Sequence, residues 1–351
     1  MKKFLLPLIA LVVVASLLFG AFGCAPKAAE KIEWKLSAEM SGGEFIVGVI
    51  MQHFADEVFA RSDGRLEITI YPSNELGFKA AEYLRALKEG YFDMIGLSVG
   101  FVAGDFPLIN IYGLPFVLPS PDVMMQAVDL VDKKIMWPLI ERDFELVYLW
   151  TSVMPGQHIW SKEPLASPED LDGLKIRSYS KALSDTLGPA GAAPVVMESS
   201  EVYMALQRGV IDAFVTSGTT AYATKSYEVI SYCNVTYFLY GGVINAVNKA
   251  SFDSLPPDLQ EIVRQVANEM SDWSLEQTKK YEKIDMDNMV AQGVQLIPLP
   301  EAVRSVLTTA AKENAWQGKI TDCEKAGYGS ESREMLRQYL MMVGTAAPDW
   351  L

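Results

Sequence analysis

Histidine and cysteine are scarce in this sequence. Only two histidines and three cysteines occur among 351 residues. His53 and His158 are far apart, as are Cys233 and Cys323, so the ligand spacings typical of zinc sites are missing. Two cysteines besides Cys24 are too few for a disulfide framework, although these two could pair or remain free buried thiols. We therefore predict no cofactor and no metal site.

Positive charge is also in short supply. Thirty Lys and Arg residues face 44 Asp and Glu residues, which gives a formal net charge of −14. Such a surface repels nucleic acid, and no basic patch with interleaved aromatic residues offsets it. We expect no nucleic-acid partner, and an anionic ligand would have to be held by local positive groups.

Long apolar runs are confined to the N-terminus. Lys2 and Lys3 precede an apolar run over residues 4–22, and small residues then lead into Cys24. This pattern predicts a secretory signal over residues 1–23 with a lipoprotein-like cleavage site, so that Cys24 becomes the lipidated first residue. An uncleaved membrane anchor is the alternative, because the run is about long enough to span a bilayer. Both interpretations place the body of the protein outside the cytoplasm, in the periplasm or an equivalent space.

The rest of the chain alternates between strand and helix patterns. Residues 24–31 are small and polar and are predicted to form a tether. Apolar and polar residues alternate over 32–39 and again over 65–72, with a helical pattern between them. The same alternation resumes at residue 144, so we predict two α/β units with mainly parallel sheets. In such sheets, ligands bind at the carboxyl ends of the strands.

One predicted helix is much longer than the others. Apolar residues recur at helical spacing over residues 258–292, with Pro256 and Pro257 before the pattern and Gly293 after it. At ~1.5 Å per residue, this helix would be about 50 Å long, which exceeds the width of one domain. We expect it to brace two domains together.

A short motif offers an enzymatic alternative. The stretch GLSVG at residues 96–100 fits the G-x-S-x-G pattern of serine hydrolases, with Ser98 as the nucleophile. The two histidines do not follow the usual order of a catalytic triad, however. We favour a glycine turn at a strand end, where Ser98 could still contact a ligand. The stretch MSGGEF at residues 40–45, which contains Glu44, could likewise offer backbone N–H groups to an anion or simply cap a helix.

Arg177 is the strongest candidate for a ligand anchor. It lies in the predicted strand LKIRSYS, where an inward-facing arginine is costly unless an anion meets it. Its planar guanidinium matches a carboxylate with two parallel hydrogen bonds, each worth roughly 1.5–3 kcal/mol. The alternative is an ordinary surface arginine, which would contribute little.

Several stretches resemble one known family. EDLDGLKIRSYS, GAAPVVMESSEVYMALQRGVIDA and SFDSLPPDLQEIV are similar to segments of the extracytoplasmic solute-binding proteins of tripartite ATP-independent periplasmic (TRAP) transporters, the DctP-like family. GRLEITIYPSNELG, ALKEGYFDMIGLS and GLPFVLPS resemble earlier segments of the same family. The resemblance covers nearly all of the mature chain. It implies a binding protein that is not an enzyme and that delivers an organic acid to an ion-driven membrane permease.

The resemblance also implies an architecture. It predicts a two-domain periplasmic-binding-protein fold of the α/β class, with a long helix crossing both domains and a ligand cleft between them. We place domain I at residues 32–152 plus about 241–275, and domain II at 153–240 plus about 276–351. Arg177 stands at the family's arginine position and is expected to pair with the ligand carboxylate. A binding protein for another transporter or a receptor would share this fold and differ only in its partner.

The sequence departs from the family at the expected ligand site. Many relatives carry a second arginine in a segment like FGTRQ, whereas this chain reads VMPGQHIWS and places Gln157 or His158 there. Relatives that bind sugar acids tend to have an acidic residue near Ser98 and an asparagine near Thr216. With Phe101 and Phe214 also in these segments, we expect a less polar pocket that favours a monocarboxylate with an apolar or aromatic body.

Overall fold

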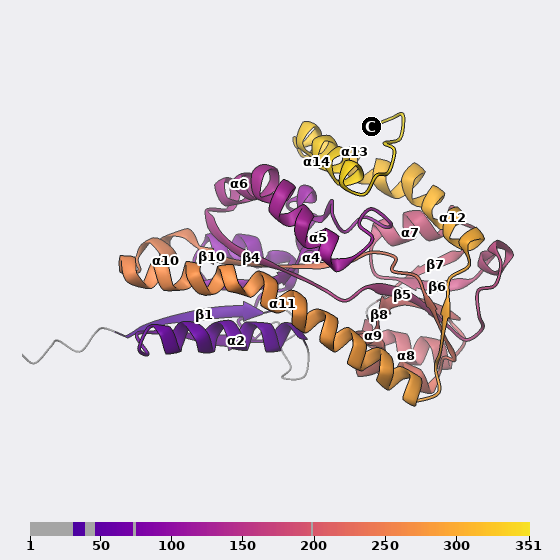
Figure 1. The fold of residues 1–351 in the computed structure, drawn as a ribbon, viewed down its shortest axis with the longest axis horizontal. Helices are drawn as coiled ribbons and strands as arrows, with labels where there is room; N and C mark the ends of the chain where they lie inside the picture. Colours follow the sequence, from indigo (N-terminus) through magenta and orange to yellow (C-terminus); the bar gives the residue numbers. More distant parts are fainter. Residues whose placement is uncertain (1–30, 39–45, 73–74, 198) are drawn as a thin grey trace, which may run out of the picture.

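The protein is built around two β-sheets with helices packed on their faces (Figure 1). The computed structural model describes residues 31–38, 46–72, 75–197 and 199–351. The strands are β1 (Ile32–Ala38), β2 (Leu66–Tyr71), β3 (Met94–Ser98), β4 (Leu146–Val153), β5 (Gln157–Ser161), β6 (Lys175–Ser178), β7 (Ala193–Val196), β8 (Ala213–Ser217), β9 (Tyr232–Val235), β10 (Gly242–Asn248) and β11 (Gln295–Pro298). The α-helices are α2 (Ile46–Arg61), α3 (Tyr83–Lys88), α4 (Val99–Val102), α5 (Pro121–Ala127), α6 (Lys133–Phe144), α7 (Lys181–Leu187), α8 (Ser199–Gln207), α9 (Gly218–Ala223), α10 (Lys249–Asp253), α11 (Pro257–Ala291), α12 (Glu301–Ala310), α13 (Gln317–Lys325) and α14 (Gly329–Met342).

The first sheet has the strand order β2-β1-β3-β10-β4. Strand β1 pairs in parallel with β2 and β3, and β10 is antiparallel to both β3 and β4. Trp34 and Leu36 of β1 point into a core that α2 covers with Phe54 and Val58. Gly64 ends the turn after α2 in the left-handed conformation that glycine tolerates best, with φ at +75°.

The second sheet has the order β11-β9-β5-β8-β6-β7. Here β5 is the antiparallel strand, paired with β8 and β9. Each sheet therefore contains one internal antiparallel strand, β10 in the first sheet and β5 in the second. The prediction of mainly parallel sheets did not include these two strands. The reason is that the chain passes directly from a strand of one sheet to a strand of the other at two places, from β4 into β5 and from β9 into β10. A strand that enters from the neighbouring sheet starts where the others end, so it runs in the opposite direction.

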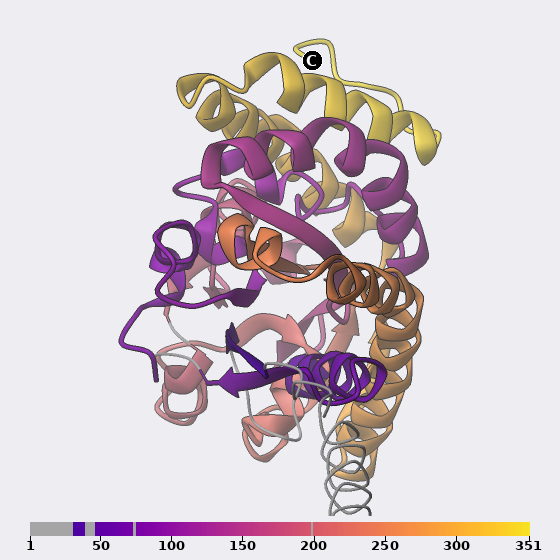
Figure 2. The same cartoon turned by 90° about the vertical axis from the view of Figure 1, so that its left-hand side faces the viewer.

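Helix α11 spans both halves of the molecule, as the sequence predicted (Figures 1 and 2). Its first half packs Leu259 and Val263 into the core of the first sheet, and Met289 packs into the core of the second. Between them, the hydroxyl of Thr278 donates a hydrogen bond of 2.7 Å to the carbonyl oxygen of Val153, where the chain leaves the first sheet. The helix thus follows the crossing from one sheet to the other.

The C-terminal helices return to the first half of the molecule. Helix α12 shares an apolar cluster with strands of the second sheet, but α14 packs beside α6, and α13 packs against α14 and residues 107–110 of the first half (Figure 1). Leu336 and Leu340 of α14 share one apolar cluster with Met136 and Ile140 of α6. The predicted placement of all of residues 276–351 in domain II does not fit this packing, since their last two helices pack with the first sheet. The other domain boundaries stay predictions.

The two described cysteines do not form a disulfide. Both Cys233 and Cys323 are free and buried, and they lie in different apolar clusters. Burial raises the pKa of both thiols, that of Cys323 to about 11, which makes them poor nucleophiles. Among the described helices, none is both long and apolar enough to cross a membrane. The predicted signal, the lipidation site Cys24 and most of the tether lie outside the described residues.

Candidate ligand-binding site

The candidate site lies where the strands of the second sheet meet the crossing segments. Gln157 at the start of β5 is paired with Ser217 at the end of β8. Arg177, near the end of β6, is paired with Phe214 in the same sheet. The carboxyl ends of β6 and β8 and the first residue of β5 are therefore at one edge. This is the edge at which sheets of this kind bind ligands.

Arg177 is buried and held in one orientation. Only 2 % of its surface is exposed. Its Nε donates to the carbonyl oxygen of Met197 at 2.9 Å, and Nη1 donates to the carbonyl oxygen of Val215 at 3.2 Å. Its Nη2 donates to the hydroxyl of Ser199 at 3.0 Å. Because a guanidinium stays charged at physiological pH, these contacts fix a positive charge inside the protein.

Tyr179 lies beside this charge. The guanidinium carbon of Arg177 lies 5.2 Å from the centre of the Tyr179 ring. The ring keeps 40 % of its surface exposed, yet the surrounding protein raises the pKa of its hydroxyl. Tyr179 is not among the predicted ligand contacts, and its place two residues after Arg177 is the signal in the sequence that could have indicated it.

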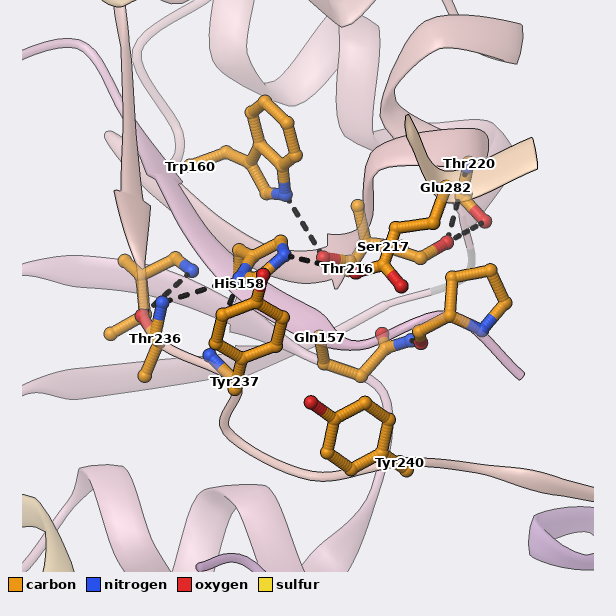
Figure 3. Close-up of polar contacts among 12 residues, drawn as sticks. Gln157, His158, Trp160, Thr216, Ser217, Thr220, Thr236, Tyr237, Tyr240 and Glu282 are labelled. Atoms are coloured by element: carbon orange, nitrogen blue, oxygen red, sulfur yellow. Dashed lines mark hydrogen bonds and ion pairs between the residues drawn. The ribbon is translucent and has the colours of Figure 1, made fainter. Parts of the chain in front are cut away.

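Gln157 and Thr216 line the same edge, next to His158 (Figure 3). The amide nitrogen of Gln157 donates to the carbonyl oxygen of Pro155 at 3.0 Å, which keeps the side chain close to its own turn. The carbonyl oxygen of Thr216 accepts a hydrogen bond of 2.9 Å from the indole of Trp160. Both residues are almost fully buried. Because Gln157 is paired with Ser217, the residue after Thr216, the structure brings these two predicted ligand contacts together.

The other predicted contacts have different locations. Ser98 ends β3 in the first sheet, and Phe101 follows on the short helix α4 with 46 % of its surface exposed. Phe214 is 1 % exposed, belongs to the apolar cluster of the second sheet and lies against Trp160. We therefore do not propose Phe214 as a ligand contact. Glu44 lies outside the described residues.

Neither histidine is arranged as a catalytic base. His53 stacks on Trp273 with their ring centres 3.9 Å apart. The Nδ1 atom of His158 accepts hydrogen bonds from the backbone N–H groups of Thr236 and Tyr237 at 3.2 and 3.3 Å. Each ring is thus committed to a contact within the fold. Among the described residues, no group of three or more His, Cys, Asp or Glu side chains could hold a metal ion.

Comparison with known proteins identifies the family. The model of the DctP family, described as bacterial extracellular solute-binding protein, family 7, matches residues 37–318. The chain belongs to this family. Its members bind a solute outside the cytoplasm and deliver it to a TRAP membrane permease; they are not enzymes. The hydrolase alternative based on Ser98 is thereby excluded, and the predicted family is confirmed.

Two curated relatives of this DctP-family protein show the level of similarity. A solute-binding protein of Albidiferax ferrireducens is 28% identical over 295 residues, covering 81% of this chain and 85% of the relative. The C4-dicarboxylate-binding periplasmic protein DctP of Rhodobacter capsulatus is 29% identical over 217 residues, covering 61% of this chain and 64% of the relative.

Solved structures confirm the two-domain fold of this DctP-family protein. The extracytoplasmic solute receptor DctP7 of Bordetella pertussis, which binds pyroglutamic acid, superposes with a TM-score of 0.74 at 24% identity, covering 87% of this chain and 99% of the receptor. A TRAP solute-binding protein of Rhodoferax ferrireducens with bound malonate gives a TM-score of 0.75 at 24% identity, covering 88% and 98%.

Proposed function

We propose that this protein captures a small organic acid between its two sheets and that Arg177 binds the acid's carboxylate. The observation that carries the proposal is the buried guanidinium of Arg177, fixed by Met197 and Val215 at the carboxyl edge of the second sheet. A guanidinium held in a fixed orientation offers its planar N–H groups to a carboxylate with matching geometry. Several related proteins are described as binding organic acids, including pyroglutamate and malonate.

Gln157 supports a narrower proposal about the acid. A neutral amide at this position offers no second positive charge, and its Nε2 donor already binds the carbonyl oxygen of Pro155. Across the junction, the exposed ring of Phe101 offers an apolar surface, with Ser98 three residues before it. These features favour one carboxylate attached to an apolar or aromatic body over a dicarboxylate or a sugar acid. Glu44 stays a predicted contact.

Domain closure would follow from contacts on both halves. Arg177, Gln157 and Thr216 belong to the second sheet, whereas Ser98 ends β3 of the first sheet and Phe101 lies on α4 directly after it. A ligand that contacts both halves favours the closed arrangement by its difference in affinity for the two states. The closed form would then be presented to the permease, or to another transporter or receptor if the partner differs.

The proposed ligand class is tested by thermal unfolding with pairs of compounds. Each carboxylic acid is compared with its neutral primary amide, which keeps the body of the molecule and removes the charge. An acid present at a hundredfold excess over its dissociation constant should stabilise the folded state by about 2.7 kcal/mol, and its amide should not. If amides stabilise the protein as well as acids do, the proposal is wrong. If no acid acts, mass spectrometry of molecules released on unfolding shows whether the site was already filled.

We also propose that Cys24 carries a lipid after cleavage of residues 1–23. The small residues Gly20, Ala21 and Gly23 before this cysteine support cleavage there. The mass of the mature protein should equal that of residues 24–351 plus a lipid, and Cys24→Ser should release the protein from membranes. A mature protein that retains residues 1–23 would show an uncleaved anchor instead.

A further inference from the structure

A pocket lies beside helix α11. It has a volume of about 630 Å³ and is formed by α11, the segment after β9, the start of α5 and strand β11. Ligand sites in proteins commonly have volumes of about 300–1,000 Å³ and mostly apolar walls with a few polar groups. The residues proposed to bind the acid do not line this pocket. Its walls are largely apolar or aromatic and include Pro119, Val235, Tyr237, Tyr240, Met286 and Leu296.

Glu282 places a carboxylate in this pocket. Its side chain is 15% exposed, and its Oε1 atom is buried with no hydrogen-bond partner among the described residues. The nearest basic group is His158, whose Nε2 atom lies 3.8 Å from Oε1, beyond hydrogen-bond distance (Figure 3). The Nδ1 atom of His158 accepts two backbone N–H groups, so the ring is held by contacts within the fold rather than by a hydrogen bond to Glu282.

The two lysines at the pocket are already paired. Lys279 binds Asp122 at 2.5 Å, and Lys283 binds Asp287 at 2.6 Å. Each lysine charge is offset by a carboxylate within the same surface region. Of the charged groups described in and around the pocket, Glu282 is left without a cation, which makes the pocket suitable for a positively charged ligand.

Two tyrosine rings supply a wall that suits such a ligand. The rings of Tyr237 and Tyr240 are within 20° of parallel, with their centres 6.1 Å apart (Figure 3). Both rest on Gly156, where a Cβ atom would lie 2.6 Å from Tyr237 and 3.1 Å from Tyr240. Tyr237 also holds a φ of +47°, a costly conformation for a bulky residue and one found at functional sites. Aromatic faces attract organic cations.

We propose that this pocket binds a small organic ammonium compound with a flat apolar body. Glu282 is its counter-ion, and Tyr237 and Tyr240 contact its body. The proposal does not depend on acid binding at Arg177, because the two sites share no residue.

Benzylamine, with neutral benzyl alcohol as its matched control, tests this proposal by isothermal titration of the full chain. Benzylamine should bind, and benzyl alcohol should bind at least tenfold more weakly. Glu282→Gln should weaken benzylamine binding at least tenfold. Glu276→Gln, an exposed substitution on the same helix, and Arg177→Gln should leave it unchanged.

A second variant keeps the test decisive if Glu282→Gln does not fold. Leu296→Trp fills the pocket from the exposed edge strand β11 without altering the carboxylate, and it should abolish benzylamine binding. The proposal is overturned if benzylamine does not bind, if benzyl alcohol binds equally well, or if the folded Glu282→Gln protein binds the amine like the wild type. In the last case, Glu282 is not the counter-ion of the amine.

Discussion

The hydroxyl of Tyr339 donates a hydrogen bond to the carboxyl group of Asp132, 207 positions earlier in the sequence. Asp132 ends η3 (Val128–Asp132), a π-helical turn between α5 and α6, and Tyr339 belongs to the C-terminal helix α14. Both side chains are fully buried. The bond therefore ties the end of the chain to the first half of the molecule.

This contact predicts a pH dependence of stability. Burial raises the pKa of Asp132 to about 8, although the hydrogen bond from Tyr339 opposes the rise. Because the carboxyl of an unfolded chain titrates near pH ~4, the folded state holds more protons between the two values. The free energy of unfolding should therefore fall by up to about 1.4 kcal/mol per pH unit from pH ~4 to about 8 and level off above. Urea unfolding of Asp132→Asn should lack this fall.

The control for this prediction is Asp272→Asn, which alters an exposed carboxylate on α11. Its unfolding free energy should run parallel to that of the wild type at pH 5, 6.5 and 8. If the free energies of unfolding of the wild type and of Asp132→Asn change with pH in the same way, the carboxyl of Asp132 is ionised normally. This account of the contact is then wrong.

Gly242 is expected to tolerate no side chain. It begins β10, where the chain re-enters the first sheet, and a Cβ atom there would lie 2.4 Å from the hydroxyl oxygen of Tyr112 and 2.8 Å from its ring. Tyr112 is 1 % exposed and has no room to move. Gly242→Ala should therefore lower the free energy of unfolding by about 1–3 kcal/mol, as overpacking in a core does.

Gly100→Ala is the matched substitution for that measurement. Gly100 lies in helix α4, and no atom would come within 4 Å of an added Cβ. The change should be neutral or stabilise the protein by up to about 1 kcal/mol, because alanine favours a helix over glycine. Equal effects of the two substitutions would show that the contact with Tyr112 does not restrict residue 242.

The buried cysteines predict that stability does not depend on a disulfide. Cys233 and Cys323 are packed in separate clusters. The midpoint of thermal unfolding should be the same with and without a reductant, and both thiols should react with a thiol reagent only after unfolding. A midpoint that falls on reduction would reveal a disulfide between them.

Local sequence patterns predicted the elements that carry their own signals. The long helix was expected at 258–292 and spans Pro257–Ala291, because prolines precede it and Gly293 follows it. Strand β10 was missed because all of its residues are buried, so no alternation appears along it. The return of α13 and α14 to the first sheet was also missed, since it depends on packing between segments far apart in the sequence.

The candidate site was only partly predictable for the same reason. Arg177 could be selected because a charge inside an apolar strand is unusual in itself. Ser199 could not be selected, because its contact with Arg177 depends on how α8 follows β7 in space. The pair of His158 and Glu282 likewise exists only because α11 crosses β5. The packing of Phe214 against Trp160 could not be predicted either, because a strand pattern does not tell which face of the sheet a helix will cover.

The central claim is that Arg177 binds the carboxylate of the ligand, and isothermal titration of Arg177→Gln tests it most directly. The acid that stabilises the wild type is titrated into this variant and into Arg208→Gln, which alters an exposed arginine. Charge-assisted hydrogen bonds are worth roughly 1.5–3 kcal/mol each, so Arg177→Gln should weaken binding by at least ~tenfold, whereas Arg208→Gln should bind like the wild type. If the folded Arg177→Gln protein binds the acid as tightly as the wild type does, Arg177 is not the anchor.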